Sequence, residues 1–174
     1  MIKNQNKNLE LTSSEFALSL DFYELTMAAA YFSSKQTKKR AIFELFVRKL
    51  PRNRSYMVAA GLEQALVYLE NLRFGKKEIS FLKSNKSFSH IKKDFFQYLE
   101  NFKFTGDVWA VPEGSILFPN EPIIRVEGPI IESQIVETFL LSMINFQSLI
   151  ATKASRITDV AGSKGIVRNN YGLA

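Results

Sequence analysis

Two side chains in the first third of the sequence have the chemistry needed to bind a flat or anionic ligand. Tyr23 offers a ring that can stack on a planar molecule and a hydroxyl that can form a hydrogen bond. Arg48 carries a planar guanidinium that can grip a phosphate through two parallel hydrogen bonds. Each has a structural alternative: a half-buried tyrosine at the edge of a helix packing face, and a solvated charge at the end of a strand. Residue type alone favours the structural alternative in both cases.

Four further titratable residues are candidates for acid–base chemistry or metal binding. Asp107, Glu113 and Glu121 could act as a general acid and base or bind magnesium; the alternative is that they only solvate a turn-rich segment. His90, the single histidine, lies among lysines, and Asp94 is the one nearby carboxylate that could orient it. We expect His90 to be an exposed surface residue, and we assign no catalytic residue and no metal ligand.

Several kinds of site are excluded by what the sequence lacks. It has no cysteine, which excludes a disulfide framework, a thiolate nucleophile and a cysteine-ligated zinc or iron–sulfur site. A single histidine excludes a metal site built from several histidines. Neither of the common glycine-rich phosphate-binding motifs, GxxxxGKS/T and GxGxxG, is present.

The composition is that of a globular chain of 174 residues, with 46% hydrophobic and 23% charged residues. Fifteen Phe, six Tyr and one Trp are ample for a packed core. The net charge of +6, concentrated in the basic segment 35–54 and opposed by the acidic segment 106–137, favours an anionic partner such as a nucleic acid, a phosphate ester or a membrane surface. Neither a membrane span nor a signal peptide is evident, so we expect a cytoplasmic protein with no membrane partner.

The elements that must position these residues alternate between helical and strand-like patterns. Apolar residues in 16–33 recur every three or four positions, which predicts an amphipathic helix capped by Ser13 or Ser14: Leu18, Phe22, Leu25, Ala29 and Phe32. The segment 40–49 is β-rich and almost continuously apolar, which predicts a strand buried on both faces and stopped by Pro51. A helix follows Gly61, with Leu62, Leu66 and Leu69 on one stripe, and two short helices are expected near 76–84 and 90–101.

The second half changes character. Short apolar runs separated by Gly and Pro predict short strands with tight turns over 105–130. The segment 131–160 predicts a long helix, or two helices with a break at 145–152, ended by Gly162 and Gly165. The tail then begins like a strand and stops, which we interpret as a chain cut short, because a lone strand cannot satisfy its backbone groups.

Four linked stretches resemble the nicotinate phosphoribosyltransferase family in order and spacing. They are LDFYELTMAAAYF (20–32), RAIFELFVRKLP (40–51), AAGLEQALVYLENLRF (59–74) and the long run from FTGDVWAVPEGS to ATKASRI (104–157). The resemblance implies an α+β fold, the N-terminal domain of a type II phosphoribosyltransferase, with helices packed on short, mostly antiparallel strands. It implies a polar tail at 1–14, this N-terminal domain at 15–150, and at 151–174 the start of an α/β barrel that is otherwise missing.

The resemblance also implies an activity. Members form nicotinate mononucleotide and pyrophosphate from nicotinate and phosphoribosyl pyrophosphate, the entry step of NAD salvage, and they use ATP hydrolysis and Mg²⁺. Tyr23 matches the family tyrosine that stacks on nicotinate and reaches into the partner subunit's site, and Asp21 matches the acidic residue beside it. Arg48 matches an arginine resembling one that contacts phosphoribosyl pyrophosphate. We expect no ATP or Mg²⁺ to bind this chain tightly.

The sequence departs from the family pattern at its end. Members continue with a Phe-Gly-Leu-Arg-Arg type motif, whereas this chain reads Tyr171-Gly172-Leu173-Ala174. Three interpretations stay open. The chain is an N-terminal part of a homodimeric enzyme and is inactive alone; it is one subunit of a split enzyme with a separately encoded barrel; or it is a non-enzymatic basic module that binds nucleic acid. We do not expect the third, because segment 35–54 lacks the aromatic and glycine pattern of nucleic-acid modules.

Overall fold

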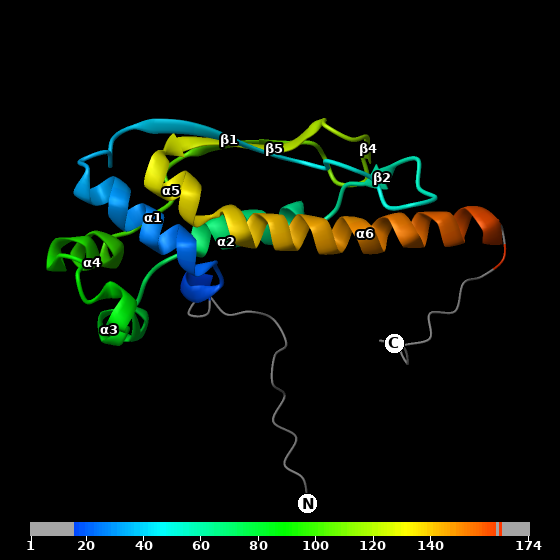
Figure 1. Cartoon of the computed structure of the whole chain (residues 1–174). Helices are drawn as coiled ribbons and strands as arrows, with labels where there is room; N and C mark the ends of the chain where they lie inside the picture. Colours follow the sequence, from blue (N-terminus) through cyan, green and yellow to red (C-terminus); the bar gives the residue numbers. More distant parts are fainter. Residues whose placement is uncertain (1–15, 163, 165–174) are drawn as a thin grey trace, which may run out of the picture.

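A sheet lies over a layer of helices in the computed structural model, which describes residues 16–162 and residue 164 (Figure 1). The larger sheet has three antiparallel strands in the order β1-β5-β3, and a smaller sheet pairs β2 with β4. Short 3-10 turns occur at Phe16–Leu18 and Lys86–Phe88. The helices and strands are α1 (Phe22–Ser33), β1 (Arg40–Phe46), β2 (Met57–Val58), α2 (Leu62–Asn71), α3 (Lys76–Ser84), α4 (Lys93–Glu100), β3 (Asp107–Ala110), β4 (Ile116–Leu117), β5 (Pro122–Pro129), α5 (Ile130–Ile135) and α6 (Glu137–Ala161). The predicted α+β class with antiparallel strands is confirmed.

Strand β1 is not buried on both faces, contrary to the prediction. Its residues alternate between exposed and half-buried because successive side chains point to opposite faces of the sheet and the helices lie under one face (Figure 1). Ala41, Phe43 and Leu45 are half-buried and alternate with exposed residues, of which Ile42 is 53% exposed and Phe46 is 42% exposed. The apolar run of β1 therefore includes two residues, Ile42 and Phe46, on an exposed face that also carries Arg40 and Glu44.

The first helix begins later than its apolar pattern predicted. A short 3-10 turn ends at Leu18, and α1 starts at Phe22 with Asp21 at the N-cap position. The buried face is formed by Glu24, Leu25, Ala28 and Ala29, while Phe22 is 47% exposed. The predicted stripe shares Leu25 and Ala29 with this face but omits Glu24 and Ala28. The predicted caps, Ser13 and Ser14, lie outside the described residues.

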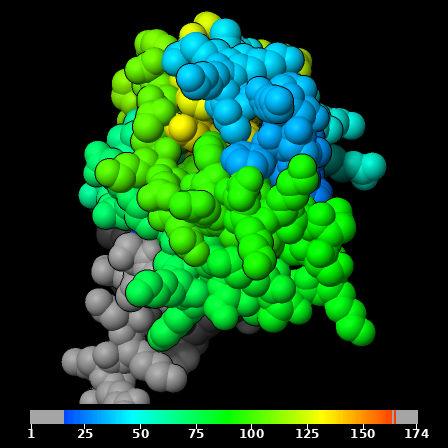
Figure 2. Space-filling view, turned by 90° about the vertical axis from the view of Figure 1, so that its left-hand side faces the viewer, coloured from blue at the N-terminus to red at the C-terminus, as the bar shows by residue number. Residues whose placement is uncertain are grey.

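An aromatic cluster joins the 3-10 turn at Phe16–Leu18 and helix α2 to the start of α6. The rings of Tyr68 and Phe139 stack with centroids 3.8 Å apart, and Phe16 meets both rings edge-on. Helices α3 and α4 match their predicted ranges and pack against one another at one end of the molecule (Figure 2). Phe22 of α1 contacts Phe88, in the 3-10 turn between these two helices, and Phe32 of α1 contacts Phe95 of α4, both edge-on. These contacts fix α1, which carries Tyr23, against the rest of the fold.

Helix α6 is continuous through 145–152, where a break was considered. The buried hydroxyls of Ser148 and Thr152 bond the backbone of the β2 segment: the N–H of Val58 donates to Thr152 Oγ1 at 2.9 Å, and that of Ala60 donates to Ser148 Oγ at 3.1 Å. The polar residues therefore pair a strand with the helix and do not interrupt it. The helical segment is instead divided at Val136, between α5 and α6.

The predictions for the C-terminal part of the chain concern the end of α6, the tail and the domain boundary. Gly162 follows the last turn of α6 as predicted, whereas Gly165 and the strand-like tail lie outside the described residues. The proposed boundary between residues 150 and 151 falls inside α6. No helix within the described ranges combines the length and the apolar character that a bilayer crossing needs.

Candidate functional site

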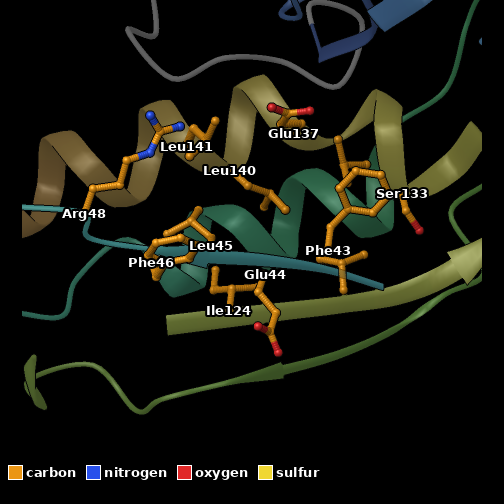
Figure 3. A pocket seen from close by; sticks show the side chains of 12 residues that line it. Phe43, Glu44, Leu45, Phe46, Arg48, Ile124, Ser133, Glu137, Leu140 and Leu141 are labelled. Atoms are coloured by element: carbon orange, nitrogen blue, oxygen red, sulfur yellow. The ribbon is translucent and has the colours of Figure 1, made fainter. Parts of the chain in front are cut away.

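A groove runs between strand β1 and helix α6 and contains Arg48 (Figure 3). It consists of two adjoining hollows of about 190 and 510 Å³, which share Leu45, Phe46, Arg48 and Leu141. The larger hollow falls within the range of about 300–1,000 Å³ that small-molecule sites occupy. Its walls are mostly aliphatic and aromatic, so the few polar side chains determine what it can bind.

Arg48 lies just after β1 and lines both hollows from the β1 side. Its side chain is exposed, and it makes no ion pair or hydrogen bond with any described residue, so its five donors are available. In Figure 3 its guanidinium extends over α6 beside Leu141. Lys49 joins it in lining the larger hollow. The geometry suits a guanidinium that contacts an anion at the mouth of the groove.

Tyr23 lies near Glu137 but does not line this groove. The ring of Tyr23, on the first turn of α1, is 43% exposed. Glu137, the first residue of α6, lines the smaller hollow together with Arg48. Desolvation, followed by the nearby carboxylate of Glu137, raises the pKa of Tyr23 to about 12. Tyr23 is therefore a neutral hydrogen-bond donor at physiological pH.

The third predicted site residue, Asp21, is held by its backbone. Its N–H donates to Thr138 Oγ1 at 3.2 Å, while its own side chain makes no capping hydrogen bond to α1. Thr138 in turn donates to Glu24 Oε1, from its N–H at 2.8 Å and from its hydroxyl at 2.7 Å. This arrangement joins the first turn of α1 to the first turn of α6. It also gives the N–H of Thr138, in the first turn of α6, a hydrogen-bond partner that the helix itself cannot supply.

The carboxyl group of Glu24 is fully buried, and its Oε2 has no hydrogen-bond partner among the described residues. Burial raises the pKa of this carboxyl to about 7, although its hydrogen bonds to Thr138 act in the opposite direction. The nearby carboxylates of Glu137 and Asp21 raise it further. The junction beneath Tyr23 therefore contains a carboxyl that titrates near neutral pH.

The other titratable candidates lie away from the groove. His90 is exposed, as predicted. Asp107 pairs with Arg40 at 3.4 Å, Glu113 accepts hydrogen bonds at the start of α2, and Glu121 accepts one from the N–H of Phe118 at 3.0 Å. These carboxylates have structural partners in place of an acid–base or magnesium geometry. Within the described residues no group of three or more His, Cys, Asp or Glu could hold a metal ion.

The structure thus places Tyr23 and Asp21, at the start of α1, beside the start of α6, and places Arg48 in the groove that Glu137 of α6 also lines; Tyr23 and Asp21 themselves line neither hollow. Sequence reasoning missed Glu24 and Thr138, which join α1 to α6, and Glu137, which lines the smaller hollow. Glu24 left a signal, because a carboxylate on the buried face of an amphipathic helix needs a partner. Glu137 and Thr138 left none, because their roles depend on contacts with residues more than a hundred positions away.

The sequence profile of the nicotinate phosphoribosyltransferase N-terminal domain matches residues 18–145. A nicotinate phosphoribosyltransferase of Mycobacterium tuberculosis is 45% identical to this chain over 151 residues, which is 87% of this chain and 32% of that protein. The Bacillus subtilis nicotinate phosphoribosyltransferase is 44% identical over 158 residues, or 90% and 32% of the two chains.

The crystal structure of human nicotinic acid phosphoribosyltransferase superimposes with a TM-score of 0.78 at 33% identity. The match covers 88% of this chain and 32% of the human chain. The chain therefore spans about a third of the length of these relatives, and the match includes the segments that carry Tyr23, Arg48 and Glu137.

Proposed function

The chain belongs to the nicotinate phosphoribosyltransferase family, and from this premise we propose that it supplies part of a site that joins nicotinate to phosphoribosyl pyrophosphate. The products are nicotinate mononucleotide and pyrophosphate. In this proposal Tyr23 stacks on the pyridine ring of nicotinate, Asp21 lies beside it, and Arg48 contacts a phosphate of phosphoribosyl pyrophosphate. None of the described residues is assigned a bond-making or bond-breaking step.

One observation carries the proposal: Thr138 joins the first turn of α1, which carries Tyr23, to the start of α6, where Glu137 lines the same hollow as Arg48. An aromatic ring and a free guanidinium therefore lie in one region of the fold. A flat pyridine carboxylate suits a half-exposed tyrosine ring, and a pyrophosphate suits a permanently charged planar donor. The two substrates of the family need these two kinds of group.

We propose that ATP and Mg²⁺ take part in the reaction as the family resemblance implies, and we assign no described residue to either. The cation would supply charge neutralisation to the pyrophosphate. The contribution of this chain is then to bind and orient. Arg48 adds a positive charge at the groove, and Tyr23 places a ring face beside it.

We further propose that the chain acts in the cytoplasm together with the part of the fold that fills the other two thirds of its relatives. That part is either the remainder of a full-length, homodimeric enzyme or a separately encoded barrel. The groove supports an assembled site, because its mouth is open and Arg48 has no partner within the described residues.

Complementation tests the proposal. The purified chain is mixed with the part of the Bacillus subtilis relative that lies beyond the match, and nicotinate mononucleotide is quantified by chromatography with nicotinate, phosphoribosyl pyrophosphate, ATP and Mg²⁺ present. We expect product in the mixture and none with either part alone. An associated, folded mixture that forms no product contradicts the proposal.

Two variants assign the residues. Tyr23→Ala should raise the KM for nicotinate about tenfold, since aromatic stacking contributes roughly 0.5–1.5 kcal/mol. Arg48→Ala should raise the KM for phosphoribosyl pyrophosphate about tenfold or more. Phe81→Ala and Arg52→Ala, which change exposed residues elsewhere, are the matched controls. If Phe81→Ala raised the KM for nicotinate as much as Tyr23→Ala does, or Arg52→Ala raised the KM for phosphoribosyl pyrophosphate as much as Arg48→Ala does, these assignments would be wrong.

A further inference from the structure

The second half of helix α6 presents its polar and apolar faces in the reverse of the usual order. Its inward face carries three hydroxyl residues that are hydrogen-bonded to the segment 56–60: Ser148, Thr152 and Ser155. Its outward face carries four large apolar residues, all exposed: Phe146 (63%), Ile150 (49%), Ile157 (46%) and Val160 (91%). At 3.6 residues per turn the two sets lie on opposite sides of the helix. A surface helix normally turns its apolar stripe toward the core, so this outward face needs an explanation.

The four apolar residues and Lys153, which lies between them, form the outer stripe of α6. The outer stripe is about 21 Å long, from Phe146 to Val160. Toward its end, a hollow of about 460 Å³ is lined by Lys153, Arg156, Ile157, Val160 and Ala161. In Figure 1 this half of α6 has β2 and β4 above it and no described element below it. Contiguous exposed apolar residues of this kind mark an interaction surface.

We propose that the outer stripe of α6 docks the part of the fold that fills the other two thirds of the relatives. That part would face the stripe with apolar side chains and with carboxylates opposite Lys153 and Arg156. The inference rests on the proposed function and deepens it, because it assigns a surface to the association that the proposed function requires.

The length of the relatives and the charge of the outer stripe argue for this occupant. This chain covers only 32% of the Mycobacterium tuberculosis and Bacillus subtilis relatives, so in both proteins the larger part of the polypeptide is joined to the domain described here. Lys153 and Arg156 are exposed, and neither has an ion-pair partner among the described residues. Their charges are therefore available to carboxylates of the docked part.

A second copy of this chain fits the outer stripe less well. A two-fold axis pairs a surface with itself, and Lys153 lies at the middle of the stripe, midway between Phe146 and Val160. Self-pairing would therefore place Lys153 beside its own copy, and like charges that meet in an interface are costly. The stripe also covers only roughly 200 Å², whereas a stable complex buries about 800 Å² on each partner. It is therefore suited to be one part of a larger interface.

The test measures binding of this chain to the part of the Bacillus subtilis relative that lies beyond the match, by titration calorimetry without substrates. Ile150→Asp and Ile157→Asp should each raise the Kd at least tenfold, because each places a carboxylate where an apolar contact is expected. Lys153→Glu should raise it by an amount that shrinks as salt is added. Phe81→Asp, a change of an apolar residue on α3 that is 57% exposed, is the matched control and should leave the Kd unchanged.

The urea midpoint of each variant alone checks its folding. Because Ile150 and Ile157 are about half exposed, we expect midpoints equal to that of Phe81→Asp. Ile157→Ala, which favours the helix, should raise the Kd less than Ile157→Asp, and it provides the measurement if an aspartate variant does not fold. A Kd that is the same in wild type and in all the α6 variants would overturn the inference, as would a wild-type chain that does not bind.

Two further outcomes separate this inference from its alternatives. Sedimentation of the chain alone should show a monomer; a dimer that Ile157→Asp dissociates would assign the outer stripe to a second copy and overturn the inference. Binding that depends on the stripe but yields no nicotinate mononucleotide would count against the proposed function alone. Product formed by mixtures whose binding the α6 variants do not change would count against this inference alone.

Discussion

Glu24 and Thr138 lie 114 residues apart in the sequence, and Glu24 Oε1 accepts hydrogen bonds from both the N–H and the hydroxyl of Thr138, at 2.8 and 2.7 Å. The pair joins the start of α1 to the start of α6 beneath Tyr23. Because the Glu24 carboxyl is fully buried, the junction has a pH dependence as well as a geometry.

Glu24→Gln should change how stability depends on pH. The pKa of Glu24 rises from 4.5 in a model peptide to about 7 in the folded chain, so the folded state binds this proton more tightly than the unfolded state. The stabilisation is complete below pH 4.5 and is lost as the pH rises through about 7, a loss of about 3 kcal/mol. The glutamine variant removes this contribution. Its free energy of unfolding, measured by urea titration, should therefore fall less steeply between pH 4.5 and pH 7.5.

Glu132, a second buried carboxyl, has a raised pKa because of desolvation, and it adds a slope of the same sign in both proteins. The difference between wild type and Glu24→Gln isolates the contribution of Glu24. Glu70→Gln, at an exposed position, serves as the control. Identical slopes in wild type and Glu24→Gln would show that Glu24 does not titrate as stated.

Thr138→Val should destabilise the junction more than Thr138→Ser. Valine removes the hydroxyl that accepts from Asp21 N–H and donates to Glu24, whereas serine keeps it. The loss of hydrogen bonds at a partly buried position costs about 1–3 kcal/mol. The urea midpoint at pH 7 measures the difference, and a valine variant as stable as the serine variant would contradict the assigned role.

Glu113→Ala should weaken the start of α2. Glu113 Oε1 accepts hydrogen bonds from the N–H groups of Gly61 at 2.8 Å and Leu62 at 2.7 Å, so a remote carboxylate caps this helix. Loss of such a cap costs about 0.5–2 kcal/mol. Hydrogen exchange at the Leu62 amide should accelerate, and Glu113→Gln, which keeps an acceptor oxygen, should accelerate it less. Exchange that matches wild type in both variants would exclude the cap.

Gly61→Ala should destabilise the fold more than Gly114→Ala. Both glycines have positive φ values, +103° and +84°, which cost an alanine about 1–2 kcal/mol. A Cβ at Gly61 would also lie 3.0 Å from the carbonyl oxygen of Met143 on α6, whereas one at Gly114 would meet nothing within 4 Å. Thermal unfolding of both variants measures the added effect of the helix contact. Equal melting temperatures of the two variants would mean that α6 can move away from a Cβ at residue 61 without loss of stability.

Much of the secondary structure was predictable because it depends on local patterns. The apolar spacing after Gly61 predicted helix α2, but not its buried face, because Leu66 of the expected stripe is 41% exposed and Ala65 and Tyr68 are buried. A short helix was predicted at α3, and the glycines and prolines of 105–130 predicted short strands. The other errors depend on tertiary structure. A helix break was considered at 145–152, where Ser148 and Thr152 bond the backbone of the β2 segment, and full burial was predicted for β1, which has one exposed face.

The site residues also fall into those that the sequence could identify and those that it could not. The residue types of Tyr23 and Arg48, together with the family motifs around them, were sufficient to select both as candidates from sequence. Asp107, Glu113 and Glu121 had equally suitable chemistry, and the sequence could not show that each has a structural partner.

The sequence by itself determined the family, the helix-forming and strand-forming segments, and the ring and guanidinium that the site needs, because these follow from side-chain chemistry and short-range periodicity. Only the tertiary structure decided that Glu137 and Thr138, at the start of α6, meet the start of α1 beside a groove that contains Arg48. The reason is physical: a hydrogen bond between residues more than a hundred positions apart depends on how the packed elements close the chain between them, and local sequence patterns carry no information about that closure.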